Sequence, residues 1–353
     1  MIRKELNIDV VHAAERRVLE VFKNHREVVM SISGGKDSIC MSDIVIKTMQ
    51  KYDISFSRLM VVFFDEEAMY PDVIELVKKW RLKFLSLGAK FLWFCMPIRH
   101  YNCCNRLAND ESFYCWEPGK EDVWCREMPS FAIRNHAQFK IGMSYQEFSN
   151  NAFKDVCQMI GLRANESLQR KMAILNKRDV MKFYPIYDWK DKDVWLYIKR
   201  NDLEIPITYI YLYKCGVTRN KLRISQFFSI DTIRTLPKLL EFYPELYERV
   251  IRREPNADMV IMYWNTSMFR NSGQDKDFHV EHDWKSKLAE EMKKASANPS
   301  NYPGYIEAKR LLSNVTNETY AKVYQDIYNV LMAGDPKRRA YRAILFSIKS
   351  TKA

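Results

Sequence analysis

The stretch Val28-Val29-Met30-Ser31-Ile32-Ser33-Gly34-Gly35-Lys36-Asp37-Ser38 decides the fold. It opens with a largely apolar run of strand length, and residues 37–49 beyond the glycine pair repeat apolar side chains at helical spacing. Two glycines let the backbone turn tightly and point several N–H groups at one anion, and a following helix adds its positive end. The stretch therefore predicts an anion-binding loop between a buried strand and a helix.

Polar side chains in this loop suit a phosphate group. Lys36 can neutralise a phosphate, and Asp37 can cap the helix. The spacing differs from that of the Walker P-loop, which places more residues between its glycines and the lysine. A lone glycine pair can also be an ordinary turn into a helix, but the full motif in this context favours phosphate binding. The expected ligands are the loop amides at Gly34 and Gly35 together with the hydroxyls of Ser31, Ser33 and Ser38.

Strands and helices alternate on both sides of the loop. Apolar runs at residues 59–64, 90–95 and 156–160 read as strands, and helical patterns cover residues 8–25, 71–87 and 191–200. Short joints between them predict an α/β fold, a Rossmann-like, doubly wound and mainly parallel sheet with ligands at the carboxyl ends of its strands. Asp65 directly follows one such strand, so we expect it in the nucleotide site.

The alternation also suggests a division into domains. Residues 1–205 are predicted to form the nucleotide-binding domain, with a cysteine-rich insertion at about residues 96–144. Residues 206–353 form a mainly helical C-terminal region, and the stretch near 297–304, which is rich in Asn, Pro and Gly, is the expected hinge before a final helical segment.

Composition limits the class of protein. The chain has 353 residues, 47% of them hydrophobic, which is enough to bury a large core. It contains no apolar run of membrane-spanning length, and its first residues lack a secretory signal, so we expect a cytoplasmic protein with no membrane partner. A net charge of +12 favours an anionic partner, which can be a nucleotide, a nucleic acid or an acidic protein. The basic run at residues 337–342 can bind nucleic-acid phosphates or form a solvated helix face.

A second motif follows the strand at residues 156–160. In Gly161-Leu162-Arg163-Ala164-Asn165-Glu166-Ser167, Arg163 can bind a phosphate or sulfate with two hydrogen bonds. Glu166 can hold that guanidinium or a metal-bound water. The alternative is a surface ion pair between Arg163 and Glu166 at the start of a helix. We expect Gly161, Arg163 and Ser167 to contact the nucleotide.

The cysteines allow a metal site without specifying one. Cys103, Cys115 and Cys125 are the candidate ligands for zinc or an iron–sulfur cluster, but they lack the paired C-x-x-C spacing of structural zinc sites. Buried thiols are the alternative interpretation. His279 and His282 can also ligate, although their polar, acidic surroundings favour a solvated loop.

Four ordered motifs resemble a known family. Residues 33–38 resemble the PP-loop of the adenine nucleotide α-hydrolase superfamily, which holds the pyrophosphate of ATP or the phosphosulfate of PAPS (phosphoadenosine phosphosulfate). Residues 63–65 with Pro71, residues 161–167 and residues 184–195 resemble the remaining motifs of the PAPS reductase branch. Parts of residues 102–129, with 222–225 and 243–247, further resemble the immunoglobulin-binding regulator A group, whose members often accompany a ParB-like partner protein.

The resemblance implies a ligand and several activities. It implies ATP or a related adenine nucleotide, with Mg²⁺ to offset the phosphate charge, and an ATP pyrophosphatase that adenylylates its substrate through Lys36, Asp37, Arg163 and Glu166. The alternatives are sulfur transfer from PAPS or onto DNA, and a nucleotide-sensing regulator that acts with DNA or a ParB-like protein. Two departures distinguish the chain from the reductases. Asp65-Glu66-Glu67 replaces their Asp-Thr-Gly, and no cysteine follows Cys215, whereas the reductases keep a nucleophilic cysteine near the C-terminus.

Overall fold

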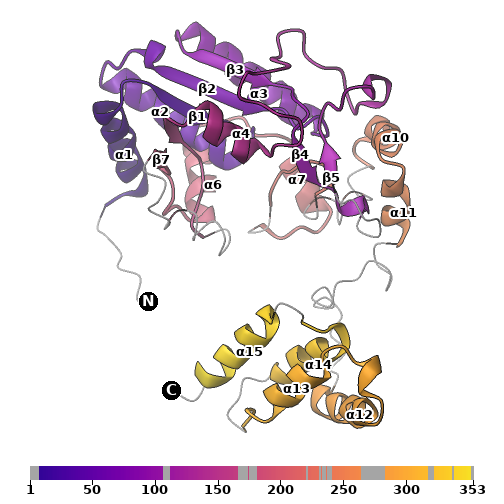
Figure 1. Cartoon of the computed structure of the whole chain (residues 1–353). Coiled ribbons are helices and arrows are strands. Elements are labelled where there is room, and N and C mark those ends of the chain that lie inside the picture. Colours follow the sequence, from indigo (N-terminus) through magenta and orange to yellow (C-terminus); the bar gives the residue numbers. More distant parts are fainter. Residues whose placement is uncertain are drawn as a thin grey trace. The chain divides into compact units, whose positions relative to one another are not determined.

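The chain forms two compact units, which are residues Met1–Met262 and Tyr263–Ala353 (Figure 1). The computed structural model describes residues 8–105, 112–165, 174, 181–219, 222–229, 232, 236, 241–263, 283–316, 322–335 and 338–350. No helix among these residues is both long and apolar enough to cross a membrane.

A parallel sheet forms the centre of the first unit. Its described strands are β1 (Val28–Ser31), β2 (Leu59–Phe64), β3 (Lys90–Phe94), β6 (Cys157–Met159) and β7 (Lys182–Phe183). They lie in the order β3-β2-β1-β6-β7, and every neighbouring pair is parallel. The two residues of β7 are too few for a periodic pattern, so the sequence did not predict this strand.

Helices follow the strands as the apolar spacing predicted. They are α1 (Val10–Asn24), α2 (Lys36–Lys51), α3 (Pro71–Ser86), α4 (Tyr145–Ala152) and α6 (Asp191–Arg200). Pro71 is the first residue of α3, where its missing N–H costs no hydrogen bond. The alternation of parallel strands and helices confirms the Rossmann-like α/β fold.

The strand order places the loop after β1 at the point where the chain changes direction. From β1 the chain moves to β2 and β3 on one side, and it later returns to β6 and β7 on the other side. In open parallel sheets this reversal creates a crevice beyond the carboxyl ends of the strands, where ligands bind. Residues 33–35 therefore lie where such a fold places its ligand.

The cysteine-rich insertion covers one face of the sheet. It contains the antiparallel pair β4 (Arg99–Tyr101) and β5 (Ser112–Tyr114), which the sequence did not predict. Ile133 pairs with the edge strand β3: its N–H donates to Trp93 O over 2.8 Å, and its carbonyl accepts from Cys95 N over 2.9 Å. Ile133 and Phe139 also pack against the cluster around Phe148 of α4. The insertion is thus part of the core of this unit.

The remaining helices divide between the two units. The helices α7 (Thr208–Lys214), α10 (Pro244–Arg253) and α11 (Asn256–Tyr263) follow the sheet, and the second unit is built from α12 (Trp284–Ala297), α13 (Tyr305–Leu312), α14 (Val323–Ala333) and α15 (Arg339–Ser350) (Figure 1). The compact units divide at residue 262, whereas the sequence placed a domain boundary at residue 205. The stretch at 297–304, which was expected to be a hinge, lies inside the second unit. There a Cβ on Gly304 would come within 1.6 Å of the Val330 carbonyl oxygen, so only glycine allows this approach.

Candidate functional site

The loop after β1 has the backbone that anion binding requires. Gly34 adopts a φ of +73°, and a Cβ at this position would lie 2.7 Å from a methyl group of Val73. Gly35 is the N-cap residue of α2. Ser38 links the two sides of the loop, because its hydroxyl donates to Gly35 O over 2.8 Å and accepts from Ser33 N over 3.1 Å. The first turn of α2 is therefore held against the end of β1, which Ser31 terminates.

Lys36 is buried and fully engaged by protein groups. Its side chain is 3% exposed, and its Nζ donates to the carbonyl oxygen of Leu222 over 2.7 Å. The same Nζ lies 3.9 Å from Asp37 Oδ2 and 3.8 Å from Asp191 Oδ1. Burial lowers the pKa of Lys36, and the carboxylates of Asp37 and Asp191 act in the opposite direction. Lys36 is thus held by two carboxylates at the start of α2.

Arg163 joins the same group from the end of β6. Its Nε lies 2.6 Å from Asp37 Oδ1, and one terminal nitrogen lies 3.8 Å from Asp191 Oδ1. A Cβ on Gly161 would lie 3.3 Å from Ser38 Cα, so glycine allows the strand end to come close to α2. Two cations and two carboxylates therefore form one buried cluster. The sequence suggested that Asp37 caps α2, but Gly35 is the N-cap, and Asp37 pairs with Arg163 instead.

Tyr209 closes the cluster from α7. Its hydroxyl accepts a hydrogen bond from the backbone N–H of Lys36 over 2.8 Å, and its ring centroid lies 5.4 Å from Lys36 Nζ. Burial raises the pKa of Tyr209, so the hydroxyl keeps its proton at neutral pH. The tyrosine therefore occupies an amide of the first turn of α2 that a phosphate oxygen could otherwise accept from.

Asp65 lies in a separate cluster at the end of β2. One carboxylate oxygen accepts from Trp93 Nε1 over 2.7 Å, and the other accepts from Arg126 and from Glu67 N. Its backbone carbonyl accepts from Trp116 Nε1 over 2.8 Å. The sequence placed Asp65 among the nucleotide ligands. In this structure its side chain is fully buried and used by these protein partners.

Glu67 anchors the insertion and α10 to the same strand end. It has a left-handed φ of +57°, at the position where the related reductases have glycine. Its carboxylate accepts from Trp116 N over 2.6 Å, from Cys125 N over 3.1 Å and from Arg253 Nε over 2.9 Å. Burial raises the pKa of Glu67, with Arg253 opposing the shift. The pocket region next to the loop is therefore built differently from that of the reductases.

The cysteines of the insertion are buried free thiols. Cys103, Cys115 and Cys125 are at most 2% exposed. Burial raises the pKa of Cys115 and of Cys125 far above that of an ordinary thiol, which disfavours the thiolate that metals bind. Over the described residues, no three His, Cys, Asp or Glu side chains gather in a way that could hold a metal ion.

Several predicted residues lie elsewhere. Glu166, Ser167, His279 and His282 are outside the described residues, as is Lys337 of the basic run. Farther along that run, Arg339 and Arg342 are exposed on α15, while Arg338 lies 3.5 Å from Glu307.

Sequence reasoning missed three groups that surround Lys36. Asp191 looked like an ordinary acidic residue in the first turn of a helix, and Tyr209 looked like one of many aromatic residues. Leu222 contributes a backbone carbonyl, which carries no signal in the sequence. A motif-adjacent acid such as Asp191 could have been found by its position two residues before the Asp193-Val194-Trp195 motif.

Comparisons with known proteins agree with this arrangement. The family model described as "Phosphoadenosine phosphosulfate reductase domain" matches residues 27–219, more than half of the chain. YbdN of Escherichia coli strain K12 is 27% identical over 247 residues, covering 63% of this chain and 59% of YbdN. An uncharacterized protein of Methanocaldococcus jannaschii is 24% identical over 266 residues, covering 69% of this chain and 53% of that protein. The chain thus spans less than two thirds of the length of either relative.

A solved structure shares the fold at low identity. Phosphoadenylyl-sulfate reductase from Candida auris, in a phosphate complex, is 13% identical with a TM-score of 0.36, covering 65% of this chain and 99% of that chain. The finer resemblance to the immunoglobulin-binding regulator A group stays a prediction. The matched residues 27–219 include the loop after β1, Gly161, Arg163 and the whole parallel sheet. This chain therefore belongs to the phosphoadenosine phosphosulfate reductase domain family.

Proposed function

We propose that this chain binds ATP, or a closely related adenine nucleotide, in the loop after β1 and transfers its adenylyl group to an oxygen of an acceptor. The observation that carries the proposal is the buried pairing of Lys36 and Arg163 with two carboxylates at the N-terminus of α2. A buried cation that is already oriented can exchange a carboxylate for a phosphate at little conformational cost. The loop amides and the positive end of α2 add to the attraction for the phosphates.

The donor groups also fit Mg²⁺. Asp37 and Asp191 supply hard carboxylate oxygens beside the proposed phosphate position, and Mg²⁺ is commonly held by one or two carboxylates together with substrate phosphates. When bound, Mg²⁺ would offset phosphate charge. Asp37 and Asp191 are the residues that would hold it.

The proposed reaction requires positioning more than proton transfer. The acceptor oxygen forms a bond to the α-phosphorus, the bond from that phosphorus to the bridging oxygen breaks, and pyrophosphate leaves. Lys36, Arg163 and the loop amides stabilise the negative charge that develops on the phosphate oxygens. Such preorganised electrostatics do not depend on a strong general base.

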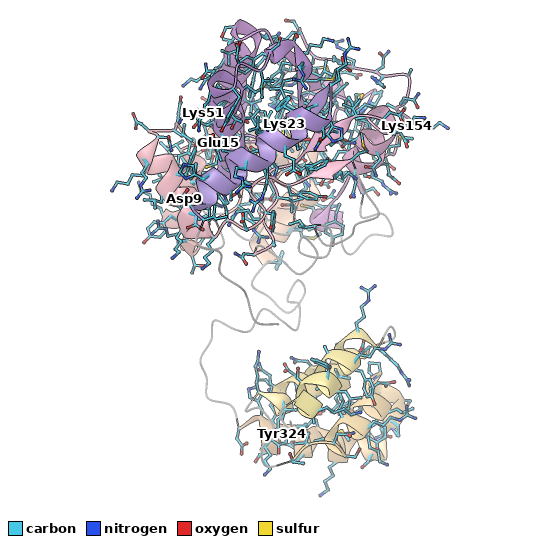
Figure 2. The ribbon with its side chains drawn as sticks, turned by 90° about the vertical axis from the view of Figure 1, so that its left-hand side faces the viewer. Asp9, Glu15, Lys23, Lys51, Lys154 and Tyr324 are labelled. Carbon is cyan, nitrogen blue, oxygen red and sulfur yellow. The ribbon has the colours of Figure 1, made fainter. Side chains whose placement is uncertain are left out.

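Calorimetric titration with ATP, adenylylsulfate and PAPS tests the nucleotide site. We expect Lys36→Ala and Gly35→Val each to weaken binding at least about tenfold, because they remove a phosphate charge and block the backbone approach. Lys51→Ala is the matched control, since it removes the same charge from the exposed far end of the same helix, where Lys51 pairs with Glu15 (Figure 2). Undiminished affinity in both loop variants, with folding intact, would refute the loop assignment.

The alternatives remain separable by assay. PAPS reduction needs an accessible thiolate, but seven of the eight cysteines are buried, and only Cys215 is half-buried. We therefore expect no sulfite release from PAPS with reduced thioredoxin. Turnover that disappears in Cys215→Ser would instead support sulfur chemistry. Nucleotide binding without any turnover would support a regulator that acts with DNA or a ParB-like partner.

A further inference from the structure

A basic pocket lies one aromatic ring away from the buried lysine of the loop. It has a volume of about 390 Å³ and is lined by Lys192, Asp193, Trp195, Leu196, Lys199 and Arg219. Five of these residues belong to α6, and Arg219 follows α7. The pocket is distinct from the cluster of Lys36, Arg163, Asp37 and Asp191.

The cations of this pocket are not neutralised by the protein. Within the described ranges, no carboxylate pairs with Lys192, Lys199 or Arg219, and all three residues are exposed. Asp193, the acid of the pocket, already accepts a hydrogen bond from Lys190 N over 2.7 Å. The lysines stand two helical turns apart, about 10 Å along the helix axis. Three unpaired cations around one opening therefore attract an anion with more than one charged group.

Trp195 gives the pocket an aromatic wall and connects it to the loop. Its ring centroid lies 6.0 Å from the guanidinium carbon of Arg219 and 5.9 Å from Lys36 Nζ. It also meets the ring of Tyr209 edge to face, at 5.7 Å between centroids. The indole Nε1 is buried and has no hydrogen-bond partner in the part of the chain that the structure describes. A buried donor without an acceptor is rare in proteins and is consistent with a ligand that supplies one.

We propose that this pocket binds a nucleotide unit of the acceptor substrate, with its phosphates on Lys192, Lys199 and Arg219 and its base against Trp195. Cationic side chains interleaved with an aromatic ring are the general means by which proteins hold unpaired nucleotides. The role as acceptor site rests on the proposed adenylyl transfer, because the pocket lies beside Lys36. Binding of the nucleotide unit itself does not depend on that reaction.

Fluorescence anisotropy of a labelled single-stranded oligonucleotide tests the inference on the full chain. We expect the double variant K192Q/K199Q, and separately Arg219→Gln, to weaken binding about tenfold and to flatten its salt dependence, because each lost phosphate contact removes about 0.7 from the logarithmic salt slope. The double variant K23Q/K154Q is the matched control. It removes the same charge from Lys23 on α1 and from the exposed Lys154 (Figure 2), and it should bind as the unmodified chain does.

Competitors identify the source of the nucleotide unit. Displacement by a mononucleotide alone supports a small nucleotide acceptor, and displacement only by unlabelled oligonucleotide supports a nucleic-acid strand. Equal displacement by polyglutamate would overturn the inference, because the pocket would then respond to charge alone. Unchanged oligonucleotide binding in K192Q/K199Q and in Arg219→Gln would also overturn it.

ATP titration of the same proteins separates this inference from the proposed function. If ATP binds in a Lys36-dependent manner while the pocket variants bind oligonucleotide normally, the pocket inference fails and the nucleotide site stands. If ATP does not bind but the pocket variants lose oligonucleotide binding, the pocket stands and the proposed function fails.

Discussion

At the scale of single residues, the state of the loop depends on Tyr209. The tyrosine hydroxyl accepts from the Lys36 amide over 2.8 Å, in a position that a phosphate oxygen would take in the proposed complex. A buried N–H without an acceptor costs about 1–3 kcal/mol. Tyr209 therefore satisfies the loop amide when no nucleotide is bound.

We expect Tyr209→Phe to lower the free energy of unfolding by about 1–2 kcal/mol, because it leaves the Lys36 amide without its acceptor. Urea denaturation measures the change. The control is Tyr213→Phe on the same helix, where the side chain is 64% exposed and the loss of a hydroxyl should have little effect. Saturating ATP should reduce the difference between Tyr209→Phe and the unmodified chain, because a phosphate oxygen then accepts from the same amide. Equal stability of the two variants without ATP would contradict this role.

At the scale of elements, Glu67 joins three segments that are distant in the sequence. From the end of β2 it receives hydrogen bonds from Trp116 and Cys125 of the insertion and from Arg253 of α10. The left-handed backbone of a non-glycine residue costs about 1–3 kcal/mol and persists only where the surroundings hold it. The carboxylate contacts provide that support.

We expect Glu67→Ala to destabilise the first unit by about 3–5 kcal/mol, because the guanidinium of Arg253 would stay buried without its carboxylate. Glu66→Ala is the neighbouring control: the Glu66 carboxylate lies 3.9 Å from His100 and is partly exposed, so a change under about 1 kcal/mol is expected. Adding Arg253→Met to Glu67→Ala should restore part of the loss, since it removes the unpaired charge. A small effect of Glu67→Ala in urea denaturation would show that the network does not hold these segments together.

At the scale of the whole molecule, the site is confined to the first compact unit. Lys36, Arg163, Asp191 and Tyr209 all precede residue 262, as does the carbonyl of Leu222. The second unit has its own core, in which Leu288 and Ala295 of α12 are buried with Leu331 of α14 and Ile348 of α15. Each unit thus buries its own apolar residues.

A chain that ends at Met262 should therefore bind ATP with unchanged affinity and unfold cooperatively. A chain that ends at Asn298 should retain ATP binding too, but it separates α12 from α13, α14 and α15 and exposes Leu288 and Ala295. We expect its remaining α12 segment to be cleaved rapidly in limited proteolysis, unlike the chain that ends at Met262. Loss of ATP binding in the shorter, still folded chain would mean that the second unit contributes to the site.

The sequence by itself determined the elements and the position of the loop. The apolar periods at residues 28–32, 59–64 and 90–95 specified β1, β2 and β3, because side-chain alternation and helical spacing are local properties of the chain. The glycine pair at 34 and 35 likewise encodes its turn locally, since Gly34 requires a positive φ. The proposed roles of these loop residues in nucleotide binding stay predictions.

Only the tertiary structure decided which groups meet. The partners Lys36 and Leu222, and likewise Glu67 and Arg253, are 186 positions apart, so no periodic pattern relates them. The same holds for the boundary at residue 262, which depends on whether α7 and α10 pack with the sheet unit. Ion pairs and core packing depend on the path of the chain through space, and a local pattern specifies each element without specifying its neighbours.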